Sequence, residues 1–361
     1  MSASAAGTSR TDAARRPDWY PALAPFARPD ARRAVWQLVN TLVPYAAVWA
    51  AMAYLAPRHP WLMLALSVPA AGLLVRAFII FHDCCHGSFL PSPRANRIVG
   101  YLTGLLTLMP FDLWRRAHLQ HHATVGDLDR RGTGDVWTLT LREYLDASRP
   151  KRLFYRVFRN PFVMFLAGPV AVFVVGNRFS PRGATAGERF SVRVTNLGIV
   201  AAAVAASLTI GLRTFVVVQS VVGVLAGAAG IWLFYIQHQF EDVYWSRHDA
   251  WNPWQAALAG SSYYKLPKPL QWLTGSIGLH HVHHVQARIP NYALQRCLDR
   301  VPVLQTVPPL TFRRSLHSLR LRLLDETHER MVTLADLRRA RRAEREGGTM
   351  GSGRQAGASG R

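Results

Sequence analysis

Long apolar blocks alternate with arginine-rich polar segments along this chain. Two blocks, 34–56 and 61–81, are each long enough to cross a lipid bilayer, and the short break Pro57–Pro60 separates them. We therefore expect a helical hairpin that crosses the membrane and returns to the starting side just before His82.

A second hairpin is expected over 194–212 and 214–236, joined by a very short turn. The preceding loop, 178–193, carries several arginines against one glutamate, which favours the cytoplasmic side. The blocks 97–113 and 162–177 are shorter and contain glycine or proline, so we expect re-entrant or interfacial helices there. The predicted fold is an all-α integral membrane protein with about four spans in two hairpins and a cytoplasmic helical cap.

The pattern divides the chain into three parts. Residues 1–33 are polar and basic and lack an apolar core near the start, which predicts a flexible cytoplasmic tail rather than a signal peptide. Residues 34–320 contain all the apolar blocks and form the expected membrane domain. Residues 321–361 are basic and then rich in Gly and Ser, which predicts a cytoplasmic tail that is disordered at its end.

Composition supports a membrane protein and argues against a nucleic-acid-binding protein and a disulfide-rich protein. Half of the chain is apolar, only 18% is charged, and the net charge is +22. The basic residues lie between and outside the apolar blocks, so anionic lipid explains them better than nucleic acid does. Three cysteines make no disulfide framework, and a reducing, cytoplasm-facing site is the simplest interpretation.

Histidines carry the candidate chemistry. Nine of the 14 histidines lie in three short windows, 82–86, 118–122 and 280–284. Spacings of i, i+3 and i, i+4 put the side chains of each window on one helix face. Imidazole is a common neutral metal ligand, and eight facing imidazoles are too many for one tetrahedral zinc. We therefore expect a dimetal site whose ligands are His82, His86, His118, His121, His122, His280, His283 and His284.

Two other kinds of metal protein fit the sequence less well. A membrane zinc protease would need a helical His-Glu-x-x-His, whereas the first window contains Asp83, Cys84 and Cys85 and no glutamate. The two cysteines point away from the ligand face of a helix, so packing is the expected role. A metal transporter would need polar residues inside the spans, and 194–212 and 214–236 are almost wholly apolar.

The three windows resemble the histidine boxes of membrane fatty acid desaturases, which related hydroxylases and ketolases also carry. The flanking segments are similar to the bacterial acyl-lipid Δ12 (omega-6) type, and the similarity covers roughly residues 35–320. These segments are Phe81–Phe89, Gly126–Asp135 and Gly278–Tyr292.

This resemblance implies a non-haem di-iron centre that uses dioxygen to introduce a cis double bond into a membrane-lipid acyl chain. A hydroxylase on the same scaffold is the alternative. The family implies a further ligand at the end of the last span, which His238 matches. His281 lies off the ligand face and is expected to pack behind the ligands. The residues expected to orient the imidazoles are Asp83, Asp127, Asp129, Asp135 and Glu241, with Gln237 and Gln239 as weaker candidates.

The resemblance also implies partners and a location. No electron-carrier domain is recognised in the sequence, so two electrons must come from outside, and we expect a ferredoxin-like acidic carrier attracted by the basic surface. We expect no catalytic groups beyond the metal ligands. The expected location is the bacterial inner membrane, with the active site and both termini in the cytoplasm.

Overall fold

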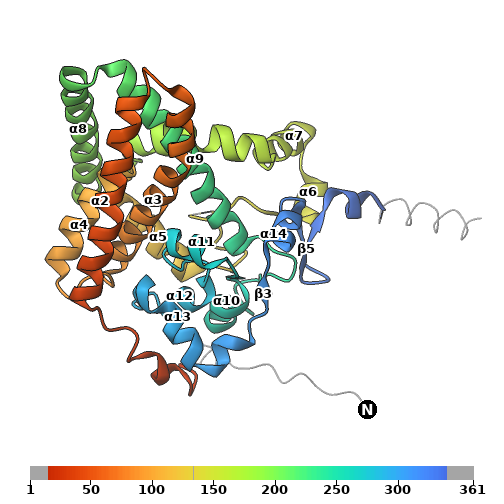
Figure 1. The fold of residues 1–361 in the computed structure, drawn as a ribbon. Coiled ribbons are helices and arrows are strands. Elements are labelled where there is room, and N and C mark those ends of the chain that lie inside the picture. The colour runs from red at the N-terminus through yellow and green to blue at the C-terminus, as the bar shows by residue number, and fades with distance from the viewer. Residues whose placement is uncertain (1–14, 133, 340–361) are drawn as a thin grey trace, which may run out of the picture.

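Four long helices dominate the computed structural model, which describes residues 15–132 and 134–339 (Figure 1). They are α2 (Ala31–Leu55), α3 (Pro60–His86), α8 (Ala186–Thr209) and α9 (Leu212–His238). Each is long and apolar enough to cross a membrane. The two predicted hairpins are therefore confirmed as candidate membrane spans, with bounds close to those expected.

Local sequence signals set the ends of these helices. The carboxylate of Asp30 accepts hydrogen bonds from the first backbone amides of α2. Thr185 and Glu188 form a capping box at the start of α8. Gly87 ends α3 with a φ of 65°, and Gly211, with a φ of 84°, makes the tight turn into α9. Both glycines adopt a left-handed conformation that other residues rarely take.

The central helix of the bundle is α3. Within the described residues, 61% of its apolar window is buried, against 22% for α2, 17% for α8 and 28% for α9. The exposed apolar faces of the other three helices suit contact with lipid rather than water. Because α3 is the buried helix, it can carry polar side chains at its end into the interior of the molecule.

The two shorter apolar blocks form broken helices. Residues 97–113 are divided between α4 (Pro93–Leu106) and α5 (Phe111–Thr124), and each helix is too short to span. Residues 162–177 form two π-helical segments, Val163–Ala167 and Val170–Val175, around Pro169. With α7 (Arg149–Phe158) they make a pair bent by 64°, the geometry of a broken span or a re-entrant loop.

Short elements form the cap below the bundle (Figure 1). The helices are η1 (Tyr20–Leu23), α6 (Leu141–Asp146), η4 (Gly176–Arg178), α10 (Pro253–Ala259), α11 (Lys268–Leu273), α12 (His280–Val285), α13 (Asn291–Arg300), η5 (Pro302–Thr306) and α14 (Phe312–Ser318). The strands are β1 (Leu139–Thr140), β2 (Tyr263–Tyr264), β3 (Pro309–Leu310), β4 (Leu321–Asp325) and β5 (Arg330–Thr333).

The strands include two, β4 and β5, in the segment predicted to be the C-terminal tail. They form a sheet of order β1-β4-β5, with β1 parallel and β5 antiparallel to β4, while β2 pairs with β3. Leu321, Leu323 and Leu324 are buried, so this part of the chain belongs to the folded cap. Leu23, in the expected N-terminal tail, is also buried. Residues 1–14 and 340–361, the outer parts of the two expected tails, lie outside the described residues.

A buried arginine fastens this sheet to the end of α9. The Arg159 guanidinium donates hydrogen bonds to the Tyr235 hydroxyl, to Gln239 Oε1 at 2.8 Å and to the Leu321 carbonyl at 3.0 Å. Its side chain is 1% exposed. These bonds fix the position at which the chain leaves α9, one residue after His238.

Close packing of α4 against α5 gives a test of the fold. A methyl group on Gly100 would lie 2.1 Å from a Phe111 ring carbon, whereas the same group on Gly223 of α9 would meet open space. Gly100→Ala should destabilise the protein by about 1–3 kcal/mol through overpacking. Thermal unfolding of the purified protein should show a lowered Tm for this variant, and Gly223→Ala is the matched control. Equal Tm values for the two variants would contradict the described packing.

Candidate metal centre

Four elements bring nine histidines together. His82 and His86 lie on the last turns of α3, and His238 is the last residue of α9. The second window lies on α5 and the third on α12, as the spacing predicts. The ends of α3 and α9 lie on the cytoplasmic side in the predicted topology. The histidines gather there, where the bundle meets the cap.

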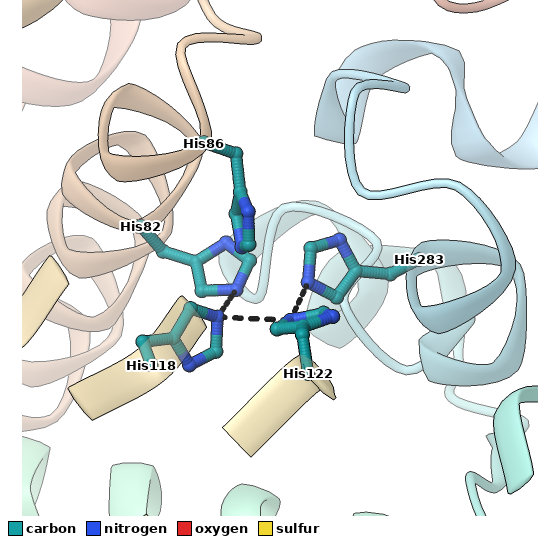
Figure 2. A group of neighbouring side chains, drawn as sticks. All are labelled: His82, His86, His118, His122 and His283. Carbon is teal, nitrogen blue, oxygen red and sulfur yellow. Dashed lines mark hydrogen bonds between the residues drawn. The ribbon is translucent and has the colours of Figure 1, made fainter. Parts of the chain in front are cut away.

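Five of these histidines surround one point, and Figure 2 shows their rings directed toward one another. We call this set the five-histidine group; its members are His82, His86, His118, His122 and His283. The Nε2 atoms of His82 and His118 are 2.9 Å apart, those of His118 and His122 are 3.1 Å apart, and His122 and His283 follow at 3.0 Å.

The other four form the four-histidine group, His121, His238, His280 and His284. Their Nε2 atoms are 3.1 Å apart between His121 and His238, and 3.0 Å apart from His238 to His280 and from His280 to His284. The two groups adjoin, because the rings of His122 and His284 stack with centroids 4.1 Å apart. All nine predicted ligands are therefore brought together, in two neighbouring sets.

The protonation state of the rings suits metal binding. Burial, and then the neighbouring imidazoles, hold the pKa of His118, His122 and His283 well below the usual value. The same causes lower the pKa of His280 and His284. The rings are thus neutral at pH 7, the form that binds metals.

The ring nitrogens also lack enough hydrogen-bond partners to explain their placement. Nε2 of His86 is buried and has no partner among the described residues. Several neutral rings that face one another cannot all be satisfied by hydrogen bonds, since each offers one donor and one acceptor. A cation at the centre of each group would satisfy the acceptor nitrogens directly. The residues present therefore fit two metal ions.

Asp83 and Asp135, two of the predicted orienting residues, contact rings of the two groups. His82 Nδ1 donates to Asp83 Oδ1 at 3.1 Å, and His121 Nδ1 donates to Asp135 Oδ1 at 2.7 Å. A partner on Nδ1 fixes the tautomer and directs Nε2 toward a metal.

Two orienting groups were missed by the sequence analysis. The backbone amide of Asn291, at 2.6 Å, and its side chain, at 2.9 Å, donate to Asp83 Oδ2. His238 Nδ1 donates to the Gly260 carbonyl at 3.0 Å. Asn291 lies in the segment after the third window that carried the family resemblance, whereas no sequence signal identifies a backbone carbonyl.

Three predicted orienting residues do not contact the groups. The backbone turns at Gly126, so Asp127 binds His248 with an oxygen–nitrogen distance of 2.7 Å. Asp129 accepts from Arg247 at 2.7 Å. Glu241 is exposed, because α9 ends before it, and its carbonyl accepts from the Met331 amide of β5.

Gln237, Gln239 and His281 pack behind the two histidine groups. His281 is the one histidine of the three windows that belongs to neither group. Gln237 Nε2 donates to the Ile277 carbonyl, and Gln239 belongs to the Arg159 cluster. His281 is fully buried, and its Nε2 lies 3.1 Å from the Leu304 carbonyl. Burial lowers its pKa to about 4, so this ring is neutral as well. Cys84 and Cys85 are buried in the apolar core beside Phe81 and Phe89.

An apolar cavity of about 400 Å³ runs from these groups into the helical bundle. His82 and His118 of one group and His280 of the other line its inner end. Trp114, which stacks on His118 with centroids 4.2 Å apart, forms part of the same wall. Side chains of α3, α9, the 106–109 segment and the bent 163–175 segment line most of the remainder, so an alkyl chain would find few polar groups along it.

The model of the "Fatty acid desaturase" family matches residues 59–309, most of the chain. This chain belongs to the fatty acid desaturase family. It is therefore an oxidoreductase of lipid metabolism, and the three windows are the histidine boxes of a desaturase.

Similar proteins include desaturases of Bacillus, Picosynechococcus and Synechocystis. A fatty acid desaturase of Bacillus subtilis is 48% identical over 90% of this chain and 93% of its own length. A Picosynechococcus sn-1 oleoyl-lipid 12-desaturase is 28% identical over 71% of this chain and 74% of its own length. A Synechocystis sn-1 acyl-lipid omega-3 desaturase (ferredoxin) is 27% identical over 63% of this chain and 64% of its own length.

Two aspartates with different contacts test the orientation of the imidazoles in this desaturase. Asp135→Asn weakens the acceptor for His121 Nδ1, and loss of such a partner lowers metal affinity by about 10–100-fold. We expect less bound metal per chain after dialysis, measured by elemental analysis. Asp129→Asn is the matched control, because Asp129 contacts Arg247 instead. If both variants lose metal equally, the contact with Asp135 does not hold the ligand.

Proposed function

We propose that this desaturase holds two iron ions, one in each histidine group, and uses dioxygen to introduce a cis double bond into a membrane-lipid acyl chain. The observation that carries the proposal is the apolar cavity, whose inner end is lined by ligands of both groups. The nine candidate ligands are His82, His86, His118, His121, His122, His238, His280, His283 and His284.

Iron suits the five-histidine group better than zinc does. Imidazole accepts iron, copper, zinc and nickel, but protein zinc is mostly four-coordinate, and the five-histidine group offers more ligands than that. When bound there, iron supplies the redox chemistry that removes two hydrogens from an acyl chain with dioxygen as the oxidant. A shell of neutral imidazoles leaves the positive charge of the metal ions uncompensated, unlike the carboxylate-rich shells of soluble di-iron bundles.

The chain itself binds, positions and shields the substrate. The cavity walls on α3 and α9 desolvate the alkyl chain and hold it against His82 and His280. Trp114 covers the His118 ring and fixes one side of the reacting segment. Asp83 and Asp135 hold two ligand rings in register, so the metal positions stay fixed relative to the cavity.

The position of the double bond is assigned from the relatives, and the side of the membrane that holds the active site is assigned from the topology. The sn-1 oleoyl-lipid 12-desaturase of Picosynechococcus and the omega-6 desaturase of spinach support the Δ12 (omega-6) position. The arginine-rich loop 178–193 supports a cytoplasmic active site and cytoplasmic termini in a bacterial inner membrane. An external carrier of the ferredoxin class supplies the electrons.

Expression in a bacterial host that lacks polyunsaturated lipids tests this function. The expected result is a new double bond at Δ12, located by mass spectrometry of the fatty acids. A hydroxylated fatty acid as the product would contradict the proposal and favour the hydroxylase alternative.

Two adjacent histidines of the third box differ in their proposed roles. His280 is a candidate ligand, whereas His281 is a packing residue. His280 belongs to the four-histidine group, whereas His281 contacts the Leu304 carbonyl. His280→Ala should remove one ligand and abolish double-bond formation. His281→Asn keeps a donor at this position and should retain most of the conversion and the metal content. Equal loss in both variants would contradict the assignment of His280 as a ligand.

The cavity predicts which residue limits the length of the acyl chain. Gly223 lines the cavity and lies 14 residues before Gln237 on α9, which is about 21 Å along the helix axis. Gly223→Leu should fill the far end, so the products should shift toward shorter chains in a fatty-acid profile. Ala229→Leu, on the exposed face of the same helix, is the control. An unchanged chain-length profile for Gly223→Leu would rule out this part of the cavity as the substrate channel.

A further inference from the structure

A glutamine lies on the inner face of α2, the first candidate membrane span. Gln37 is 3% exposed, whereas the adjacent Trp36 is 66% exposed. Burying an amide costs free energy unless its donor and its acceptor are both paired. Gln37 Oε1 is buried and has no hydrogen-bond partner among the described residues. An apolar side chain of the same size would avoid this cost, so the stability of the helix does not account for the glutamine.

The other end of the Gln37 amide begins a chain of hydrogen bonds that ends at a candidate metal ligand. Gln37 Nε2 donates to Asn291 Oδ1 at 2.9 Å. Asn291 Nδ2 donates in turn to Asp83 Oδ2 at 2.9 Å, and Asp83 Oδ1 lies 3.1 Å from Nδ1 of His82. Each of these four side chains is at most 4% exposed. The chain therefore joins α2 to the five-histidine group through the interior of the molecule.

The donors and acceptors in this chain fix the orientation of the Asn291 amide. The Asp83 carboxylate only accepts hydrogen bonds, so Asn291 must direct Nδ2 toward it and Oδ1 away from it. Oδ1 then faces α2, where Gln37 Nε2 supplies a donor. Without that donor, Oδ1 would be buried and unpaired in this orientation. The amide would lose the contact that favours the orientation required by Asp83.

The backbone at the start of α13 is held by contacts that do not involve Gln37. The Asn291 backbone amide donates to Asp83 Oδ2 at 2.6 Å. The hydroxyl of the next residue, Tyr292, accepts from the Asp30 amide at 2.9 Å and donates to the Phe89 carbonyl at 3.0 Å. Loss of the Gln37 bond should therefore leave α13 in place and change only the side-chain amide.

We propose that Gln37 is a positioning residue for the metal ligand His82. It acts through the amide of Asn291 and the carboxylate of Asp83. The inference rests on the proposed function, because it requires a metal ion in the five-histidine group. A partner on Nδ1 of a ligand imidazole directs Nε2 toward the metal, and loss of such a partner lowers metal affinity. Hydrogen bonds in a buried chain strengthen one another, so the donor at the far end supports the bond at His82.

Thr41 offers a matched comparison one turn further along the same face of α2. It is fully buried, and its hydroxyl oxygen accepts from Arg76 Nε at 3.0 Å. The Arg76 guanidinium also donates to the Trp272 carbonyl of α11. This set of contacts leads to α11 rather than to the histidines. The loss of a buried bond on α2 can therefore be separated from the loss of the bond that leads to His82.

Iron affinity of the purified full-length protein tests the inference. The variant is Gln37→Met, which keeps the length of the side chain and removes its donor, and the control is Thr41→Val. Iron(II) bound per chain would be measured by elemental analysis during competition with a chelator. In Gln37→Met the affinity for one of the two ions should fall by about 10-fold, the lower end of the effect of removing an outer partner of a metal ligand. Thr41→Val should hold both ions as the wild type does, even if its Tm is lower.

A double-mutant cycle with Asn291→Leu tests the route through Asn291. Once Asn291 is replaced, Gln37→Met should cause no further loss of affinity, because the two residues act in one chain. Additive losses would overturn the inference, since Gln37 would then act by another route. If the Asn291 variant does not fold, the comparison of Gln37→Met with Thr41→Val stands by itself.

Two results of that comparison would also overturn the inference. One is an unchanged iron affinity in Gln37→Met, and the other is an equal loss in Thr41→Val. Failure of the proposed function is distinguishable from both. A wild-type protein that binds two irons but makes no double bond would contradict the proposed function alone, whereas one that binds no iron would contradict both proposals.

Discussion

Everything in this structure depends on holding nine imidazoles with ring nitrogens directed at two points. Such an arrangement has no intrinsic stability, since facing acceptor nitrogens gain nothing from one another. The fold imposes it by bringing the ends of α3 and α9 together with α5 and α12. Contacts on the far nitrogens of His82, His121 and His238 then keep the rings from turning away.

The membrane spans serve this centre in two ways. The buried helix α3 carries His82 and His86 to the interior, while the exposed apolar faces of α2, α8 and α9 suit lipid. Glycines on α9 leave space beside it, so the same bundle that positions the ligands also contains an alkyl-sized cavity ending at them. The cap closes the other side, with Arg159 fixing the exit of the chain from α9.

Much of this could be predicted from the sequence, because the ligand spacing and the apolar blocks are local patterns. The division of the nine histidines into two groups could not be predicted from the sequence. His121 and His122 are neighbours on α5, about 100° apart around the helix, and each joins a different group because of where α9 and α12 lie. Asp127 contacts neither group, since a turn at Gly126 directs it to His248. The pairing of β4 with β1 could not be predicted, because Leu323 and Leu324 of β4 pair with residues that are remote in sequence.

Diffraction from crystals of the iron-loaded protein at the iron absorption edge tests the central claim most directly. The account predicts two anomalous peaks per chain, one among His82, His86, His118, His122 and His283 and the other among His121, His238, His280 and His284. A single peak, or peaks outside these two groups, would contradict it.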